Sequence, residues 1–279
     1  MRSLRDGRRH SRPVHRWPGG RAAAADHHGA TRGLAIDLGS SGVRGWVPGR
    51  GLVTGPAPQE GRGRPVRRGR IVDAESCAEL LGHLADTALG ADRSGAVIVL
   101  SHPVLAGSEH RSLARDLLTA LGPSGVVVLS SARAAAACAG PRGGGPLLVV
   151  DTGAEITEVT LLVDGTVADA RQAEAGLIDL EPEAPPADLV RTVLDMVVSM
   201  WRQDKHGAVS GALRRGPVLA GGGALRRDVT DGIAGRLGVR VHLADDPATT
   251  VVRGAGLILD SVLRHTGAGA PAVLPGRTR

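Results

Sequence analysis

The sequence runs twice through one order of predicted elements, and each run begins with an apolar strand that ends in Asp-x-Gly. The two turns read AIDLGSSG at 35–42 and VVDTGAEI at 149–156. Backbone N–H groups in a tight glycine turn form a concavity for phosphate, and an aspartate at the strand end can hold hydrated Mg²⁺ over it. One such turn is most often an ordinary loop. Two in the same register predict a shared binding cleft.

Hydrophobic periodicity predicts the order βββαβαβα in both halves, with a five-stranded mixed sheet in each. In the first half we expect strands at 33–37, 43–47, 50–53, 96–100 and 126–129, and helices capped by Asp73 and Ser108 and over 133–139. In the second half we expect strands at 147–151, 157–163, 166–170, 217–220 and 239–243, and helices over 187–203, after Gly223 and over 247–263. The pattern predicts an α/β protein.

The boundaries follow from composition. We expect a basic arm at 1–32, a first lobe at 33–140, a Gly/Pro linker at 141–146, a second lobe at 147–263 and a tail at 264–279, with arm and tail disordered. The arm holds eight arginines and two aspartates, which account for the whole formal charge of +6. Because the remainder is neutral, we expect no specific nucleic-acid partner and at most weak contact of the arm with a membrane surface.

Several features of the sequence bear on where the protein is found in the cell. No uncharged apolar run approaches the roughly 20 residues that cross a bilayer, and the arm lacks a stretch suited to a signal peptide. Cys77 and Cys138 lack metal-ligand spacing and sit in helical contexts, so we expect free thiols. These features predict a cytoplasmic protein, peripheral at the inner face of the membrane if the arm makes its contact.

The sequence resembles the actin, heat-shock-chaperone and sugar-kinase superfamily, and within it the bacterial actins of the MreB/Mbl rod-shape-determining type. The likeness runs through AIDLGSSGVRGWVPGRGLV, VIVLSHPVLAGSEHRSLARDLL and GPVLAGGGALRRDVTDGIAGRLGVRVHLADDPATTVVRGAGLIL. The last block is the most specific. The resemblance implies a duplicated, ribonuclease H-like actin-type fold whose two lobes surround a nucleotide cleft.

The resemblance also implies which residues bind ATP and Mg²⁺. The first phosphate loop would be Asp37, Gly39, Ser40, Ser41 and Gly42; the second Asp151, Gly153, Ala154 and Glu155; and the adenosine loop Gly221, Gly222, Gly223 and Ala224. Asp37 and Asp151 would hold the metal.

Three departures from the family pattern bear on activity. Glu155 stands where the family prefers glycine, and a carboxylate about 4 Å from a phosphate charge costs roughly 4 kcal/mol at an effective dielectric near 20 unless a metal or an arginine intervenes. Ser130 and Ser131 stand where the family carries an acid that positions the hydrolytic water, and serine is a poor general base. Both accessory subdomains are expected to be reduced to the short links 54–72 and 180–186.

Two functions therefore remain open. The first is an MreB/Mbl-like protein of cell shape and cell-wall morphogenesis that binds ATP weakly and hydrolyses it slowly at most. The second is a non-polymerising, catalytically dead partner or regulator of full-length bacterial actins or wall-synthesis proteins. A sugar or acetate kinase of the same fold ranks last, because the sequence shows no carboxylate base or substrate-recognition insert.

Overall fold

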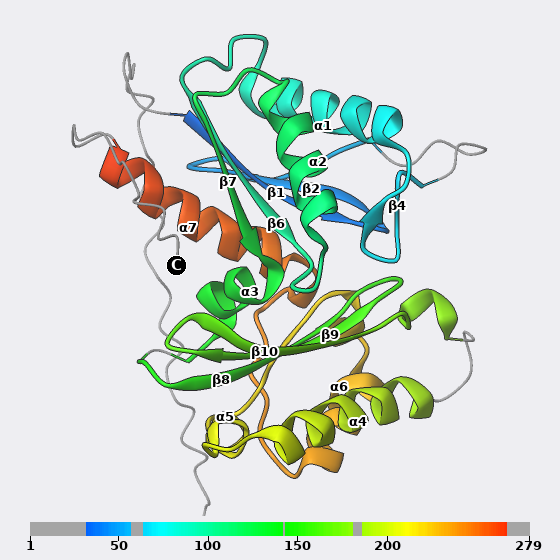
Figure 1. Cartoon of the computed structure of the whole chain (residues 1–279). Coiled ribbons are helices and arrows are strands. Elements are labelled where there is room, and N and C mark those ends of the chain that lie inside the picture. Colours follow the sequence, from blue (N-terminus) through cyan, green and yellow to red (C-terminus); the bar gives the residue numbers. More distant parts are fainter. Residues whose placement is uncertain (1–31, 57–63, 142, 181–185, 267–279) are drawn as a thin grey trace, which may run out of the picture. The chain divides into compact units, whose positions relative to one another are not determined.

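The computed structural model describes residues 32–56, 64–141, 143–180 and 186–266. The first half forms a five-stranded sheet of order β3-β2-β1-β6-β7 (Figure 1). Its strands are β1 (Arg32–Gly39), β2 (Gly42–Val47), β3 (Gly51–Thr54), β6 (Ala96–His102) and β7 (Gly125–Ser130). β1 pairs antiparallel with β2 and parallel with β6, and β6 pairs parallel with β7. The carboxyl ends of β1, β6 and β7 therefore meet at one edge.

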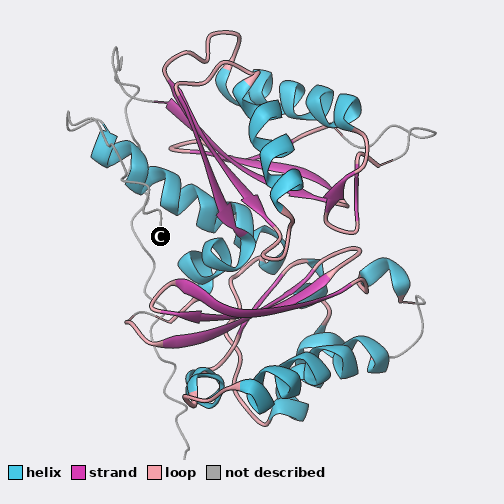
Figure 2. Ribbon diagram, viewed as in Figure 1, coloured by secondary structure: helices cyan, strands magenta, loops and turns pink. Residues whose placement is uncertain are grey.

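Alternating side chains give this sheet two apolar faces, each covered by helices (Figure 2). Leu34 and Ile36 of β1 pack in one cluster with helices α1 (Ala74–Leu89) and α2 (Ser108–Thr119). Ala35 points the other way. It packs in a second cluster with α3 (Ser131–Ala139) and the last helix, α7 (Thr250–Thr266).

The second half forms a four-stranded sheet of order β10-β9-β8-β11. Its strands are β8 (Pro146–Thr152), β9 (Thr157–Val163), β10 (Thr166–Ala173) and β11 (Val218–Ala220). One face packs against α4 (Ala187–Gln203), α5 (Ala208–Arg215) and α6 (Arg227–Leu237). The other face contributes Leu147, Val149 and Val218 to the cluster that contains α3 and α7. The two sheets thus share one of their apolar cores.

The expected α/β class, with a mixed sheet in each half, is confirmed. The strand expected at 239–243 is wrong: only a single bridge, Val218 to His242, joins this segment to the second sheet. Backbone hydrogen bonds from His242 to Pro217 and from Leu219 to His242 make up that bridge, and Leu243 already turns its side chain to solvent, 45% exposed. The second sheet therefore has four strands instead of five.

The helix starts were predicted with mixed success. Asp73 caps α1 by accepting a hydrogen bond from the Ser76 N–H at 3.0 Å. Ser108 is not the cap of α2. It is the first residue of the helix, and Gly107 holds the cap position. The predictions at 223 and 247 each resolve into a short 3-10 turn, η2 (Gly222–Leu225) and η3 (Pro247–Thr249), followed by α6 and α7.

Other element boundaries in the structure differ from those predicted from the sequence. The link at 54–72 contains a small hairpin, β4 (Val66–Arg67) and β5 (Arg70–Ile71), and a 3-10 turn η1 (Leu177–Asp179) precedes the link to α4. α7 continues through Thr266, past the expected start of the tail at 264. Residues 1–31 and 267–279, where disorder was predicted, lie outside the described residues. Within the described chain, no helix is both long and apolar enough to cross a membrane.

Candidate functional site

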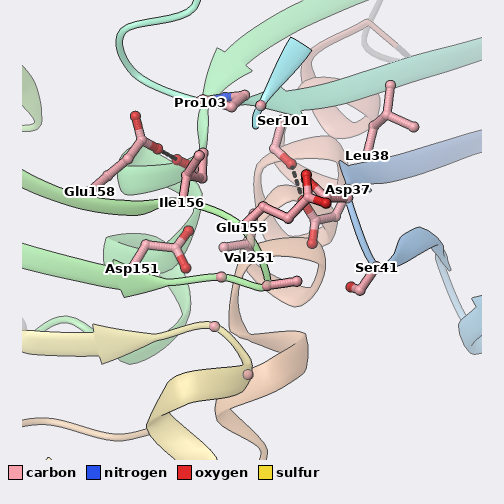
Figure 3. A pocket seen from close by; sticks show the side chains of 18 of the residues that line it. Asp37, Leu38, Ser41, Ser101, Pro103, Asp151, Glu155, Ile156, Glu158 and Val251 are labelled. Carbon is pink, nitrogen blue, oxygen red and sulfur yellow. Dashed lines mark hydrogen bonds between the residues drawn. The ribbon is translucent and has the colours of Figure 1, made fainter. Parts of the chain in front are cut away.

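One cavity of about 320 Å³ gathers the turns that the sequence singled out, and ligand pockets usually occupy roughly 300–1,000 Å³. The predicted residues that line it are Asp37, Gly39, Ser40, Ser41, Asp151, Gly153, Ala154, Glu155, Gly221 and Gly222. Gly42, Gly223 and Ala224 do not line it. The roles of all thirteen in binding stay predictions, but ten of them meet around one space (Figure 3).

The glycines of the third loop have a structural reason of their own. Gly221 has a φ of 84°, and an added Cβ would collide with the Thr152 carbonyl oxygen. At Gly223 an added Cβ would collide with the Thr152 side chain. Both glycines therefore let η2 lie directly on the end of β8. This contact brings Gly221 and Gly222 beside Asp151 at the cavity.

Asp37 and Asp151 lie near the carboxyl ends of β1 and β8, one from each half, and both line the cavity. Ser101 donates a hydrogen bond to Asp37 Oδ1 at 3.1 Å. Burial raises the pKa of Asp37, while Arg44 and this hydrogen bond oppose the rise. Burial raises the pKa of Asp151 to about 8, with added repulsion from Glu158 and Asp37. Two half-buried carboxylates with raised pKa values form a site where a cation would be stabilised.

Glu155 lines the cavity, its side chain is only 1% exposed, and its carboxylate has partners. Its Oε1 lies 3.3 Å from Arg67 Nε and 3.8 Å from Arg64 Nη1. Its Oε2 accepts a hydrogen bond of 2.6 Å from the backbone N–H of Arg68. The arginine that the sequence argument required is therefore supplied by the chain itself, from the hairpin β4–β5. We call residues 64–71 the arginine hairpin.

Arg68 connects the arginine hairpin to the second half through hydrogen bonds and an ion pair. Its guanidinium binds both carboxylate oxygens of Asp179, at 2.8 and 2.9 Å, and donates to the carbonyl oxygens of Glu155 and Glu174. Its hydrogen bonds lower the pKa of the Asp179 carboxyl. Arg68 and Gly69 have φ of 47° and 74°, as a two-residue hairpin turn requires at both positions. The hydrogen bonds of Arg68 offset the cost of this conformation in a residue other than glycine.

Ser130 and Ser131 stand where the sequence comparison predicted the loss of an acid, and the two serines differ in their surroundings. Ser131 Oγ donates to Glu158 Oε2 at 3.2 Å, so this serine has a carboxylate partner from the other half. Ser130 Oγ is buried and makes no hydrogen bond within the described residues. The site therefore does contain an acid next to these serines, contributed by β9.

Comparisons with known proteins agree with this architecture. Residues 185–266 match the family model of the MreB/Mbl protein. Over 78 residues the chain is 41% identical to the cell shape-determining protein MreB of Pasteurella multocida and 40% identical to that of Haemophilus influenzae. Each match covers 28% of this chain and 20% of the relative, so the chain matches a fifth of their length.

Solved structures extend the likeness to the whole fold. MreB5 of Spiroplasma citri, bound to ADP or to AMPPNP, has TM-scores of 0.72 and 0.74 at 16% identity, over 85% and 86% of this chain and 99% of the other. These likenesses confirm the actin-type fold that the sequence predicted. The ethanolamine utilization protein EutJ from Carboxydothermus hydrogenoformans has a TM-score of 0.59 at 15% identity, over 80% of this chain and 88% of its own.

Sequence reasoning missed three polar residues that line this cleft: Arg44, Ser101 and Glu158. His102, which the end of a buried strand predicts to be an ordinary, partly buried histidine, lines the cleft as well. Arg44 lies opposite Asp37 in the β1–β2 pairing, and Glu158 lies opposite Asp151 in the β8–β9 pairing. Residues directly opposite each other share a face of the sheet. Pairing each Asp-x-Gly aspartate with its neighbour across the hairpin would have found both. Nothing in the sequence marked Ser101.

Proposed function

We propose that this chain binds ATP with Mg²⁺ in the cleft between its two sheets and acts in cell shape and cell-wall morphogenesis. The observation that carries the proposal is the meeting of both Asp-x-Gly turns and Gly221–Gly222 around one cavity. The MreB relatives are cell shape-determining proteins, and the MreB5 structures hold ADP or AMPPNP. The shared fold and the local sequence match support the same ligand class here.

The groups at the cavity suit a metal-bound polyphosphate. Asp37 and Asp151 offer oxygen ligands of the kind that Mg²⁺ prefers, and their raised pKa values favour replacement of protons by a cation. Within the described chain, no three acidic, histidine or cysteine side chains could hold a metal by themselves. Phosphate and water would complete the coordination. Arg44 is the one arginine among the described lining residues, and it offers a positive charge to the phosphates.

The arginine hairpin changes the expectation for Glu155. Two guanidinium groups and one N–H engage its carboxylate. Its charge is therefore largely compensated before a phosphate arrives. We propose that Glu155 weakens nucleotide binding less than an unpaired carboxylate in the second phosphate turn would.

A titration with labelled ATP in the presence of Mg²⁺ tests the proposal. We expect saturable binding that requires Mg²⁺ and that Asp37→Asn and Asp151→Asn weaken. Glu109→Gln is the matched control, because Glu109 is exposed on α2 and does not line the cavity. No binding up to millimolar ATP would contradict the proposal.

A second candidate function is that of a non-polymerising partner or regulator of full-length bacterial actins or of wall-synthesis proteins. It is favoured by the short links, since only residues 180–186 separate η1 from α4. Stable protein interfaces usually bury about 1,200–2,000 Å² in total, and short links offer little such surface. Sedimentation with ATP and Mg²⁺ separates the candidates. Pelleting filaments would exclude the partner function, whereas a soluble species that shortens filaments of a full-length relative would support it.

A further inference from the structure

A second cavity, of about 340 Å³, lies away from the cleft, and no described residue lines both cavities. It is bordered by α3, the Gly-rich link from α3 to β8, the β9–β10 turn, the end of α5 and one residue of α7. Its volume falls within the range of roughly 300–1,000 Å³ that small-molecule pockets usually occupy. A cavity of this size can take a small organic molecule.

Part of the lining of this second cavity is apolar. Leu147 of β8 and Leu162 of β9 line it, and both belong to the core that the two sheets share. Ile258 of α7 lines it as well and packs against the same core. An apolar group placed on these side chains would be removed from water, which favours binding.

The charged residues of the lining are Arg133, Arg215 and Asp164. Asp164 already has a partner within the chain, because its Oδ1 accepts a hydrogen bond of 2.9 Å from the Gly145 N–H. Among the residues that the structure describes, neither arginine forms an ion pair. Two positive charges and one negative charge leave the lining with a net charge of +1.

Arg215, at the end of α5, has a donor without an acceptor. Its Nη2 donates to the Gly143 carbonyl oxygen at 3.2 Å, but its Nε is buried and has no hydrogen-bond partner within the described chain. Buried polar atoms almost always have a partner, so this N–H indicates an acceptor that the chain itself does not supply. A Cβ added to Gly145 would lie 3.7 Å from Arg215 Nη1, so glycine keeps this side of the guanidinium uncovered.

We propose that this second cavity binds a small organic carboxylate. Arg133 and Arg215 hold the carboxylate group, and the apolar part of the molecule lies on the apolar lining. Guanidinium groups bind carboxylates through paired, charge-assisted hydrogen bonds. One negative charge matches the +1 of the lining, whereas a phosphate dianion would bring a second negative charge beside Asp164. Because the cavity is separate from the cleft, the inference does not rest on the proposed nucleotide-binding function.

The test is titration of the full chain, without nucleotide, with hexanoate as the probe and saturation-transfer NMR as the measurement. We expect saturable binding with a Kd of about 1 mM or lower, as is usual for a ligand of this size. Hexanamide has the same chain without the charge, and inorganic phosphate has charge without the chain. Both should bind at least about tenfold more weakly. Absence of saturable hexanoate binding, or equal binding of hexanoate and either control, would overturn the inference.

Three variants place the binding in this cavity. Arg133→Gln and Arg215→Gln should each weaken hexanoate binding about tenfold or more, because hydrogen bonds to charged groups are the stronger ones. Arg214→Gln is the matched control, since Arg214 is exposed next to Arg215 and does not line the cavity. Its affinity for hexanoate should stay within about twofold of that of the unmodified chain.

An equal loss in all three variants would mean that hexanoate responds only to the general positive charge of the protein, and this would overturn the inference. Unchanged affinity in both cavity variants would overturn it as well. If Arg215→Gln fails to fold, judged by its thermal unfolding, Arg133→Gln decides the matter, because Arg133 is exposed on α3 and its replacement leaves the core intact.

Discussion

The two Asp-x-Gly turns share one motif but lie in different environments. In the first turn Ser41 is exposed beside the cavity, and small side chains follow the aspartate. In the second, Glu155 is buried and engaged by the arginine hairpin from the other half. The first turn leaves Ser41 open at the cavity, whereas the second turn is also part of the connection between the halves. A repeat therefore predicts a shared backbone but not a shared set of side-chain partners.

The largest expected effect concerns pH. The pKa of Asp151 is about 8 in the folded chain and near the ordinary aspartate value when unfolded, so the folded state binds the extra proton between these values. The contribution of Asp151 to stability should be complete below about pH 4 and should be lost as the pH rises through about 8, a loss of roughly 3 kcal/mol or more. Urea unfolding without nucleotide at pH 5 and pH 8.5 measures this.

The same measurement sharpens the comparison between the turns. Asp151→Asn should flatten the pH dependence more than Asp37→Asn, because Arg44 and Ser101 already support the ionised form of Asp37. Equal flattening by both variants would mean that the two aspartates titrate as one coupled pair.

The next effect concerns the metal. If one cation joins the two turns, Asp37→Asn and Asp151→Asn should each lower MgATP affinity about 100-fold, which corresponds to about 2.7 kcal/mol. Isothermal titration at pH 8 with each variant measures the loss. A loss in only one variant would show that one turn binds the metal and the other does not.

A smaller effect is expected at Glu155. Glu155→Gln removes the charge that two arginines and one N–H engage, so stability should fall by about 1–2 kcal/mol, a value reduced by the exposure of both arginines. Glu174→Gln is the control, because its exposed pair with Arg70, at 3.9 Å, should contribute less than about 0.5 kcal/mol. Urea midpoints compare the two. No loss in Glu155→Gln would mean that the arginine hairpin holds without this charge.

The smallest effect is expected in the first turn. Ser41→Ala should leave the free energy of unfolding unchanged within about 0.5 kcal/mol, as is usual for exposed positions. If the proposed nucleotide site is right, MgATP affinity should still fall about threefold, because Ser41 lines the cavity. A clear loss of stability would show that the first turn, too, has a structural role.

The elements that the sequence predicted best are those whose burial is local. The helix over 187–203 was predicted with its bounds, and Leu189, Val193 and Met200 of its apolar face are all buried. The order of elements and the two aspartates followed from the repeat in the same way. In each case the decisive pattern lies within a few residues of the element itself.

The features that sequence reasoning missed depend on distant partners. In the sequence Glu155 has no visible partner, because the arginine hairpin that engages it lies far away along the chain. The hairpin itself has the composition of a Gly/Arg/Pro linker, and its contacts with Glu155 and Asp179 appear only in the fold. The strand expected at 239–243 has the right composition but pairs at His242 alone. Partner choice across such separations is set by the packing of the whole fold and leaves no local pattern.

The position of α7 has a consequence for how the protein is made. This last described helix covers the face of the first sheet that carries Ala35, and at Gly254 there is no room for a Cβ against the Ala134 carbonyl. During synthesis β1 leaves the ribosome long before α7. The apolar face of the first sheet that α7 covers therefore stays exposed until the end of the chain has been made. Contacts so distant in sequence form slowly and leave intermediates open to aggregation. The yield of native protein should therefore depend on how long this apolar face stays uncovered during synthesis.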